Sequence, residues 1–329
     1  MILGCAGTTL ASEEREFFRA ADPLGFILFQ RNCGDPDQLR RLVTALRKTV
    51  GRDDAPVLID QEGGRVARLR PPHWPAYPSA ARIAALGEDS AVAARTVARL
   101  IADDLARLGI TVDCLPVLDL PVPGADAIIG DRAYGTEPAR VAALGRAACE
   151  GLLAGGVLPV VKHVPGHGRA TVDSHLACPV VTAARGALAA HDFAPFRALN
   201  DMAWAMTAHI VYSAIDAARP ATLSPIVIAE VIRGEIGFAG VLVSDDLSMQ
   251  ALGGDIGERA DGALAAGCDL VLHCNGRLDE MGAVAEAVGA LSAVAADRVA
   301  AGERRRRQSA APFDRAAHEA RLAAWFGVA

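Results

Sequence analysis

Eight short, apolar, β-prone runs alternate along this chain with helix-like stretches, and that alternation most constrains its fold. The runs are continuously apolar, as expected for strands of a parallel sheet that is covered on both faces. They occupy residues 1–5, 25–29, 56–60, 112–117, 159–163, 203–208, 240–245 and 269–274. Eight strand–helix units are typical of a (β/α)8 barrel. We therefore expect an α/β fold in which residues 1–329 form one barrel domain.

Helical patterns rich in Ala, Leu and Arg fill most of the intervals between these runs. They cover residues 13–20, 38–49, 90–108, 139–154, 184–199, 225–236, 257–266 and 280–300. Residues 120–136 are instead rich in Pro, Gly and Asp, which predicts a functional loop rather than a domain linker. A chain of 329 residues with 52% hydrophobic content could also form two ordinary domains, but no composition shift marks a boundary.

The bulk composition indicates where the protein works. A net charge of −6 provides no electrostatic attraction to nucleic acid, and the basic run at residues 304–307 is expected on a solvated helix face or linker. No apolar segment approaches the roughly 18 residues of a membrane span, and the N-terminus lacks a signal-like pattern. Seven cysteines without a Cys-x-x-Cys pair suit a reducing compartment. We expect a cytoplasmic protein with no membrane insertion and no obligate protein partner.

Polar residues gather where the predicted strands end, which is where barrel enzymes carry their chemistry. They are Asp60 and Glu62 after the third strand, Asp119 after the fourth, Lys162 and His163 at the fifth, His209 at the sixth, Asp245 and Asp246 at the seventh and Asn275 at the eighth. A doubly wound sheet also binds ligands at the carboxyl ends of its strands. This pattern therefore indicates an α/β site, and the strand count favours the barrel.

Residues 162–175 form the densest polar cluster, in a glycine-punctuated loop that directly follows a buried strand. Such groups cannot face a core without partners, so we expect them to face a ligand. A dinucleotide-binding loop is excluded because Thr171 stands at the third glycine position. Pro165 and Gly166 also prevent the regular helix that would present His163 and His167 together to zinc. No Gly-x-Ser-x-Gly elbow supports a serine hydrolase.

The remaining carboxylates, histidines, lysine and arginine suit a sugar substrate. Glycoside cleavage needs one group to protonate the leaving oxygen and another to attack or stabilise the anomeric carbon. Asp245, at the end of an apolar run, is placed to be the attacking carboxylate. Asp173 and His175 straddle Ser174 in an extended loop, so the carboxylate can orient the imidazole. They form a candidate acid/base pair.

Six ordered motifs extend over nearly the whole chain. They are IDQEGGRV at 59–66, PVLD at 116–119, GDRAYG at 130–135, KHVPGHG with DSH at 162–175, MTAH at 206–209 and SDDLSM at 244–249. Together they resemble the family 3 glycoside hydrolases, and among these the single-domain bacterial β-N-acetylglucosaminidases, a group of β-N-acetylhexosaminidases. The chain departs from the family pattern at residues 3–7 and at Val164, where an aromatic residue is commoner.

The resemblance implies a retaining mechanism in which Asp245 forms a covalent glycosyl-enzyme and His175, assisted by Asp173, is the general acid and then base. The residues that it implies for holding the non-reducing N-acetylglucosamine are Asp60, Arg132, Lys162 and His163. It implies no metal and no cofactor. The substrate would be a small carbohydrate, an N-acetylglucosaminyl muropeptide (anhydromuropeptide), cleaved during peptidoglycan recycling in the cytoplasm.

Neighbouring polar residues are interpreted as supports. We expect Asp246 to cap a helix or to hydrogen-bond a site residue from behind, and Glu62 to brace its loop. His167 and His209 are expected to form buried walls of the site, and Asp119 and Asp131 to shape the long loop. Four alternatives stay open, of which the first is another β-glycosidase. A phosphorylase is conceivable because a histidine repels phosphate less than a carboxylate does. A metal-dependent hydrolase would need ligands such as His175, His209 and Asp245. A sugar-binding protein could have kept the pocket without turnover.

Overall fold

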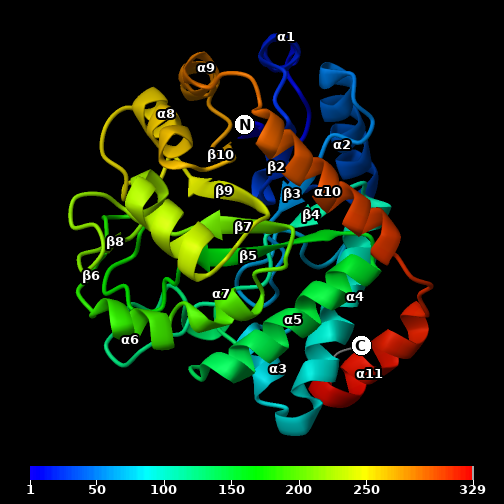
Figure 1. The fold of residues 1–329 in the computed structure, drawn as a ribbon. Helices are drawn as coiled ribbons and strands as arrows, with labels where there is room; N and C mark the ends of the chain where they lie inside the picture. The colour runs from blue at the N-terminus through cyan, green and yellow to red at the C-terminus, as the bar shows by residue number, and fades with distance from the viewer. Residues whose placement is uncertain (328–329) are drawn as a thin grey trace.

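The structure is a computed structural model that describes residues 1–327. Eight parallel strands close into a barrel, in the order β1-β10-β9-β7-β5-β4-β3-β2, with helices around them (Figure 1). The strands are β1 (Ile2–Gly4), β2 (Gly25–Leu28), β3 (Val57–Ile59), β4 (Val112–Asp113), β5 (Leu158–Val164), β7 (Trp204–Thr207), β9 (Val241–Asp246) and β10 (Leu270–His273). The predicted (β/α)8 barrel is confirmed.

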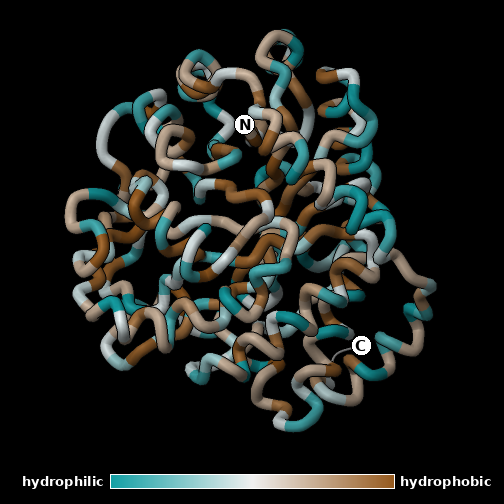
Figure 2. The backbone as a smooth tube through the Cα atoms, viewed as in Figure 1, coloured by the Kyte–Doolittle hydropathy of each residue, from teal (hydrophilic) through white to brown (hydrophobic). Residues whose placement is uncertain are grey.

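Alternate strand residues fill two separate cores, because successive side chains of a strand point to opposite faces. Ile2, Ile27 and Leu58 belong to one buried cluster, which fills the barrel interior. Phe26 and Ile59 belong to a second, larger cluster between the strands and the helices. The most hydrophobic stretches of the backbone accordingly lie in the central strands (Figure 2). Burial on both faces explains why these runs are continuously apolar in sequence.

The helices mostly follow the predicted patterns. They are α1 (Ser12–Ala21), α2 (Pro36–Val50), α3 (Ala80–Ala84), α4 (Ser90–Arg107), α5 (Pro138–Ala154), α6 (Arg185–Ala190), α7 (Ala194–Ala198), α8 (Ile256–Ala266), α9 (Leu278–Ala287), α10 (Ala293–Ser309) and α11 (Arg315–Phe326), with the π-helix η5 (Val227–Glu235) and 3-10 turns η1 (Gln30–Asn32), η2 (Gly87–Asp89), η3 (Gly130–Arg132) and η4 (Ala221–Leu223). Two further strands, β6 (Val180–Val181) and β8 (Val211–Tyr212), pair outside the barrel. The sequence patterns did not predict that pair.

Two predicted helices are each broken into two. The pattern over residues 184–199 becomes α6 and α7, because Pro195 stands in the first turn of a new helix, a position that proline favours. The pattern over residues 280–300 becomes α9 and the start of α10. Ser292 caps α10 by accepting a hydrogen bond from Ala295 N at 3.1 Å, so a new helix starts after it.

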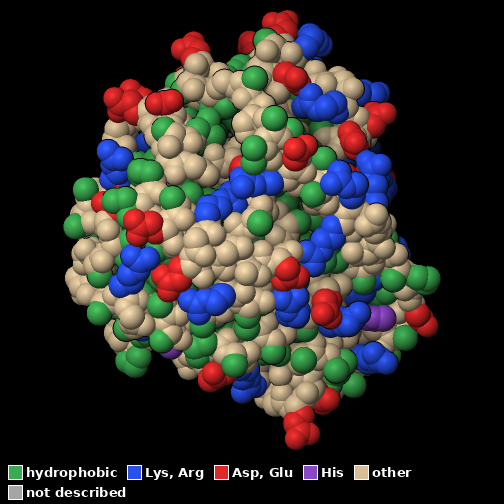
Figure 3. All heavy atoms as spheres, viewed as in Figure 1, with side chains coloured by type: hydrophobic (Ala, Val, Ile, Leu, Met, Phe, Trp, Pro, Cys, Tyr) green, Lys and Arg blue, Asp and Glu red, His purple; other side chains and the backbone are tan. Residues whose placement is uncertain are grey.

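Helix α10 covers the end of the barrel where the strands begin. It contacts β5 and β9 and crosses in front of the strands in Figure 1. Gly302 permits this approach, because a Cβ there would lie 3.1 Å from Trp204 Nε1, at the start of β7. The arginine run lies on α10, where Arg305 and Arg306 pair with carboxylates. Charges of both signs are interspersed on this face (Figure 3). The opposite mouth is left for the site.

Among residues 1–327, no helix combines the length and the apolar character needed to cross a membrane.

Candidate active site

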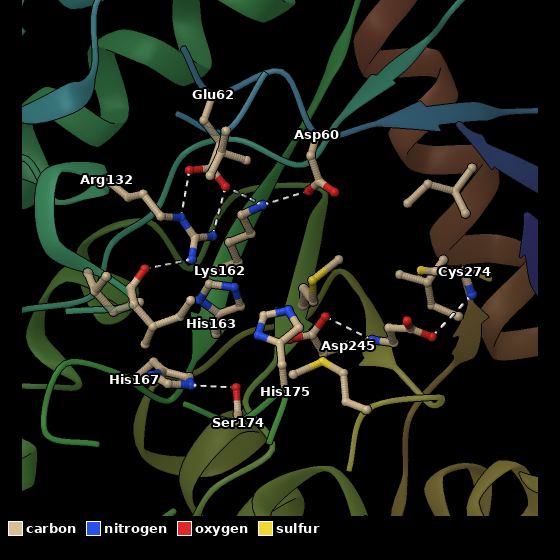
Figure 4. Close-up of a pocket in the computed structure, with 18 of the residues that line it drawn as sticks. Asp60, Glu62, Arg132, Lys162, His163, His167, Ser174, His175, Asp245 and Cys274 are labelled. Carbon is tan, nitrogen blue, oxygen red and sulfur yellow. Dashed lines mark hydrogen bonds and ion pairs between the residues drawn. The ribbon is translucent and has the colours of Figure 1, made fainter. Parts of the chain in front are cut away.

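A cavity of about 340 Å³ opens where the strands end, opposite α10. Its polar lining comes from the ends of β3, β5 and β9 and from the loops that follow β4 and β5 (Figure 4). The polar lining residues are Asp60, Glu62, Arg65, Arg68, Arg132, Lys162, His163, His167, Ser174, His175, Asp245 and Asp246. Apolar side chains, among them Phe29, Met206 and Met249, complete the wall. Such a mixed wall suits a small ligand with many hydroxyl groups.

Lys162 is the centre of a charged cluster on one side of the cavity. Its Nζ lies 2.8 Å from Asp60 Oδ1 and 2.7 Å from Glu62 Oε1. Arg132 Nε and Nη2 donate to the two oxygens of Glu62 at 2.9 and 2.8 Å, a two-pronged contact. Arg68 Nη2 donates to Asp60 Oδ2 at 3.1 Å. Figure 4 shows the contacts that run from Arg132 through Glu62 and Lys162 to Asp60.

The charges of this cluster stabilise one another. Burial would raise the pKa of Glu62, but Lys162 and Arg132 outweigh that effect and lower it to about 2. Lys162 and Arg68 likewise hold the pKa of Asp60 well below its usual value, against burial. Burial opposes the charge on Lys162, yet Asp60 and Glu62 raise its pKa above the ordinary value. All three groups are therefore charged near neutrality.

A bulge in β5 brings two consecutive residues of that strand to the cavity. The register between β5 and β7 shifts between Lys162 and Val164, which breaks the alternation of side-chain directions. Lys162 and His163 both line the cavity as a result. His163 Nδ1 donates to Asp119 Oδ2 at 2.7 Å, and Asp119 is fully buried behind it.

Asp119 also holds the start of the loop after β5. His167 N donates to Asp119 Oδ1 at 2.6 Å. Burial would raise the pKa of Asp119, but His163 and His167 keep it below its usual value. Burial, and then His163, lower the pKa of His167 to about 4, so this ring is neutral at pH 7. His167 is thus a buried wall of the cavity, with Nε2 3.0 Å from Ser174 Oγ.

Asp245 stands at the end of β9, on the side of the cavity opposite the Glu62–Arg132 pair (Figure 4). Asp246 N donates to Asp245 Oδ1 at 2.8 Å. Burial works to raise the pKa of Asp245, but His163 and His209 outweigh it and hold the pKa below its usual value. The side chain is therefore an ionised carboxylate at the cavity wall, which is the state that a nucleophile needs.

Asp246 and His209 support this corner from behind. Asp246 accepts hydrogen bonds from Ser248 N at 3.0 Å, Ser248 Oγ at 2.6 Å and Cys274 N at 3.1 Å. His209 is fully buried, with Nε2 3.0 Å from the Asp246 carbonyl oxygen and Nδ1 2.7 Å from Thr222 Oγ1. These contacts fix the turn that follows Asp245.

His175 lies on the loop after β5, at the cavity mouth (Figure 4). Its Nδ1 donates to Asp173 Oδ1 at 2.7 Å, and its backbone N donates to the same oxygen at 2.8 Å. The His175 side chain is 59% exposed and that of Asp173 is 26% exposed. Burial opposes the charge on Asp173, but the bonds from His175 hold its pKa below the usual value. A carboxylate thus orients the imidazole and leaves Nε2 free for proton transfer.

The structure brings together at one cavity six of the seven predicted site residues. These are Asp60, Arg132, Lys162, His163, His175 and Asp245, and Asp173 stands behind His175 instead. Asn275 is not part of the wall, since its amide donates to Glu280 on α9. Arg68 and Phe29 were missed, and the Arg68 guanidinium lies 5.1 Å from the centre of the Phe29 ring. Neither residue stands in a motif that would have pointed to the site.

Within residues 1–327, no group of three or more His, Cys, Asp or Glu side chains is arranged to hold a metal ion.

An ionised aspartate, a carboxylate-oriented histidine and a polar wall at one mouth of a barrel are the groups that a glycoside-cleaving enzyme needs. Residues 4–306 match the glycosyl hydrolase family 3 N terminal domain. The chain therefore belongs to glycoside hydrolase family 3.

Individual relatives agree with this assignment. The chain is 41% identical to a β-hexosaminidase of Alkalilimnicola ehrlichii over 283 residues, which cover 84% of this chain and 80% of that protein. The crystal structure of NagZ from Neisseria gonorrhoeae in complex with N-trifluoroacetyl-D-glucosamine is similar with a TM-score of 0.86 and 32% identity, over 99% of this chain and 97% of that chain. A family 3 β-N-acetylglucosaminidase from Paenibacillus has a TM-score of 0.86 and 34% identity, and the match covers 95% of this chain and 62% of that longer one.

Proposed function

We propose that residues 1–329 act as a single catalytic domain, a retaining exo-β-N-acetylglucosaminidase that removes non-reducing N-acetylglucosamine from its substrate. Membership of family 3 and the likeness to β-hexosaminidases support the activity. The likeness to NagZ, in complex with an N-acylated glucosamine, supports the sugar. The natural substrate in this proposal is a peptidoglycan fragment, an N-acetylglucosaminyl muropeptide, cleaved in the cytoplasm during cell-wall recycling.

In the first step Asp245 attacks the anomeric carbon and forms a covalent glycosyl-enzyme. The Asp245 Oδ1 atom already accepts the Asp246 N–H, so Oδ2 is the oxygen free to attack. His175 gives a proton to the leaving oxygen while the carbon–oxygen bond breaks. In the second step His175 takes a proton from water, which attacks the same carbon and releases the sugar from Asp245.

Asp173 accepts the Nδ1–H of His175 in both steps, so Nε2 is the atom that exchanges the proton: it carries the proton before the first step and is free to take one from water in the second. Asp60, Arg132, Lys162 and His163 would hold the sugar ring. Lys162 pairs with Asp60, and Glu62 pairs with both Lys162 and Arg132, so these side chains are already held in place before substrate arrives and lose little conformational freedom on binding.

The observation that carries the proposal is the sharing of one cavity by an ionised Asp245 and the Asp173-oriented His175. A non-catalytic sugar-binding protein has no need of both groups. The test is nitrophenol release from the 4-nitrophenyl β-glycosides of N-acetylglucosamine and glucose, with and without chelator and with and without phosphate. We expect cleavage of the N-acetyl substrate alone, insensitive to chelator, with free N-acetylglucosamine as product.

Other outcomes point elsewhere. Loss of cleavage with chelator would favour a metal-dependent hydrolase. Sugar 1-phosphate as the product in phosphate buffer would make the enzyme a phosphorylase. Binding of N-acetylglucosamine without cleavage of either glycoside would leave a sugar-binding protein.

A further inference from the structure

The segment 171–177, which carries Asp173 and His175, is tied to the rest of the molecule at one point. Ser174 Oγ lies 3.0 Å from His167 Nε2. The other hydrogen bonds of this segment are internal and run to Asp173 from the residues that follow it. Within residues 1–327, the His167–Ser174 contact is thus the only hydrogen bond that links the segment to the remainder of the structure.

The burial of Ser174 differs from that of its neighbours. Ser174 is 3% exposed, whereas the side chains of Asp173 and His175 are 26% and 59% exposed. The serine is therefore the inward-facing residue between two more accessible ones. The predicted extended loop is wrong here: residues 174–176 form a turn, because Leu176 N and Ala177 N both donate to the Asp173 carbonyl oxygen. Fixing the serine fixes the backbone that carries the other two.

His167, the partner of Ser174, is held in place by the residues around it. Its ring is buried, and its backbone N–H donates to Asp119 Oδ1 at 2.6 Å. Asp119 Oδ2 accepts from His163 Nδ1 at 2.7 Å, on the sugar-facing wall. The path from Ser174 through His167 to Asp119 therefore joins the acid/base segment to the wall that carries His163.

The partners of His167 also fix the direction of its bond to Ser174. His167 Nδ1 is buried and has no hydrogen-bond partner among the described residues. A proton there would leave an unsatisfied N–H, which costs more than an unused acceptor, so we place the proton on Nε2. Nε2 then donates to Ser174 Oγ.

We propose that His167 and Ser174 are positioning residues, a hydrogen-bonded latch that holds the Asp173–His175 pair at the cavity shared with Asp245. The proposal rests on the proposed acid/base role of His175. Neither latch residue takes part in proton transfer. Removing the latch leaves the Asp173–His175 bond intact but lets the pair move as a unit away from the leaving oxygen.

The test compares Ser174→Ala with wild type on two N-acetyl-β-glucosaminides, one with an unactivated alkyl leaving group and one with 2,4-dinitrophenol. A hydrogen bond with a net value of about 1 kcal/mol corresponds to about a 5-fold change in population. We expect kcat/KM to fall about 5-fold or more for the alkyl glycoside and less than about 2-fold for the dinitrophenyl glycoside, which needs little protonation.

Two further comparisons separate positioning from general structure. His167→Gln keeps an N–H donor near Nε2 and should retain more alkyl-glycoside activity than His167→Phe, which keeps the ring but no donor. Thr171→Ala, an exposed residue of the same segment, is the matched control and should behave as wild type. Hydrogen exchange of residues 171–177 should be faster in Ser174→Ala than in either wild type or the control.

An equal loss on both substrates, or unchanged exchange in Ser174→Ala, would overturn the latch. If wild type cleaves neither glycoside, the proposed function fails, and the exchange measurement still decides whether Ser174 restrains the segment.

Discussion

Glu62→Gln should destabilise the protein by about 3 kcal/mol at pH 7, because the buried carboxylate neutralises two buried cations. The Glu62 side chain is 4% exposed and contacts Lys162 at 2.7 Å and Arg132 at 2.8 Å. Its pKa falls from 4.5 to about 2, a difference of about 2.5, and each unit is worth about 1.4 kcal/mol of preference for the charged form. Glutamine has the shape of the neutral acid and loses that preference.

The loss of stability in Glu62→Gln should become smaller as the pH falls. Because the pKa of Glu62 is lower in the folded state than in the unfolded state, the ionised carboxylate stabilises the folded protein fully at pH values above the unfolded-state pKa of 4.5. That stabilisation declines as the pH falls towards the folded-state pKa of about 2. The gap between wild type and Glu62→Gln should therefore be constant from pH 7 to about 5.5 and narrow by more than about 1 kcal/mol by pH 3.5.

Urea unfolding followed by tryptophan fluorescence at several pH values measures this gap. Glu150→Gln is the matched control, since Glu150 is 45% exposed and pairs with Arg95 at 3.0 Å on the surface. That variant should change the free energy of unfolding by less than about 1 kcal/mol at any of these pH values. A gap for Glu62→Gln below about 1 kcal/mol at pH 7, or one that does not narrow in acid, would refute the account of the charged cluster.

Two further variants test the packing and the chemistry. Gly151→Ala should lower the free energy of unfolding by about 2 kcal/mol, because the added Cβ would lie 2.4 Å from the Arg95 carbonyl oxygen of α4. The control is Gly282→Ala on α9, where the added Cβ meets open space and the change should be neutral or stabilising. Equal changes in the two variants, measured by urea titration, would contradict this prediction. His175→Ala should lower kcat/KM for unactivated glycosides by about 100-fold or more and spare dinitrophenyl glycosides, and equal loss on both would exclude it as the acid.

The barrel could be predicted from sequence because its strands are buried on both faces and its polar residues follow the strand ends. The two broken helices could not be predicted from hydrophobic pattern alone. Their local signals, Pro195 and the capping Ser292, are present in the sequence but were outweighed by the surrounding helix-forming residues. The β6–β8 pair was not predicted because strands of two residues are too short to show an alternating or continuously apolar pattern.

The site was predictable where a residue ended a strand or stood in a motif, and less so where its role depends on a distant partner. Asp119 was expected to shape the long loop, yet its carboxylate holds both His163 and His167. Glu62 was expected to brace its loop, and it does so by binding Lys162 and Arg132 from other elements of the barrel. Such contacts follow from the closed arrangement of the strands, which sequence spacing does not contain.

The measurement that tests the central claim most directly is the mass of the covalent intermediate. His175→Ala, incubated with the 2,4-dinitrophenyl β-glycoside of N-acetylglucosamine, should form the glycosyl-enzyme quickly and hydrolyse it slowly, because the activated leaving group needs no acid while water still needs a base. Intact mass should then increase by one N-acetylglucosaminyl unit, and peptide mapping should locate it on Asp245 within β9. An adduct on another residue would contradict the proposed mechanism. So would a combined result in which His175→Ala releases dinitrophenol without forming an adduct and Asp245→Asn releases dinitrophenol as fast as wild type.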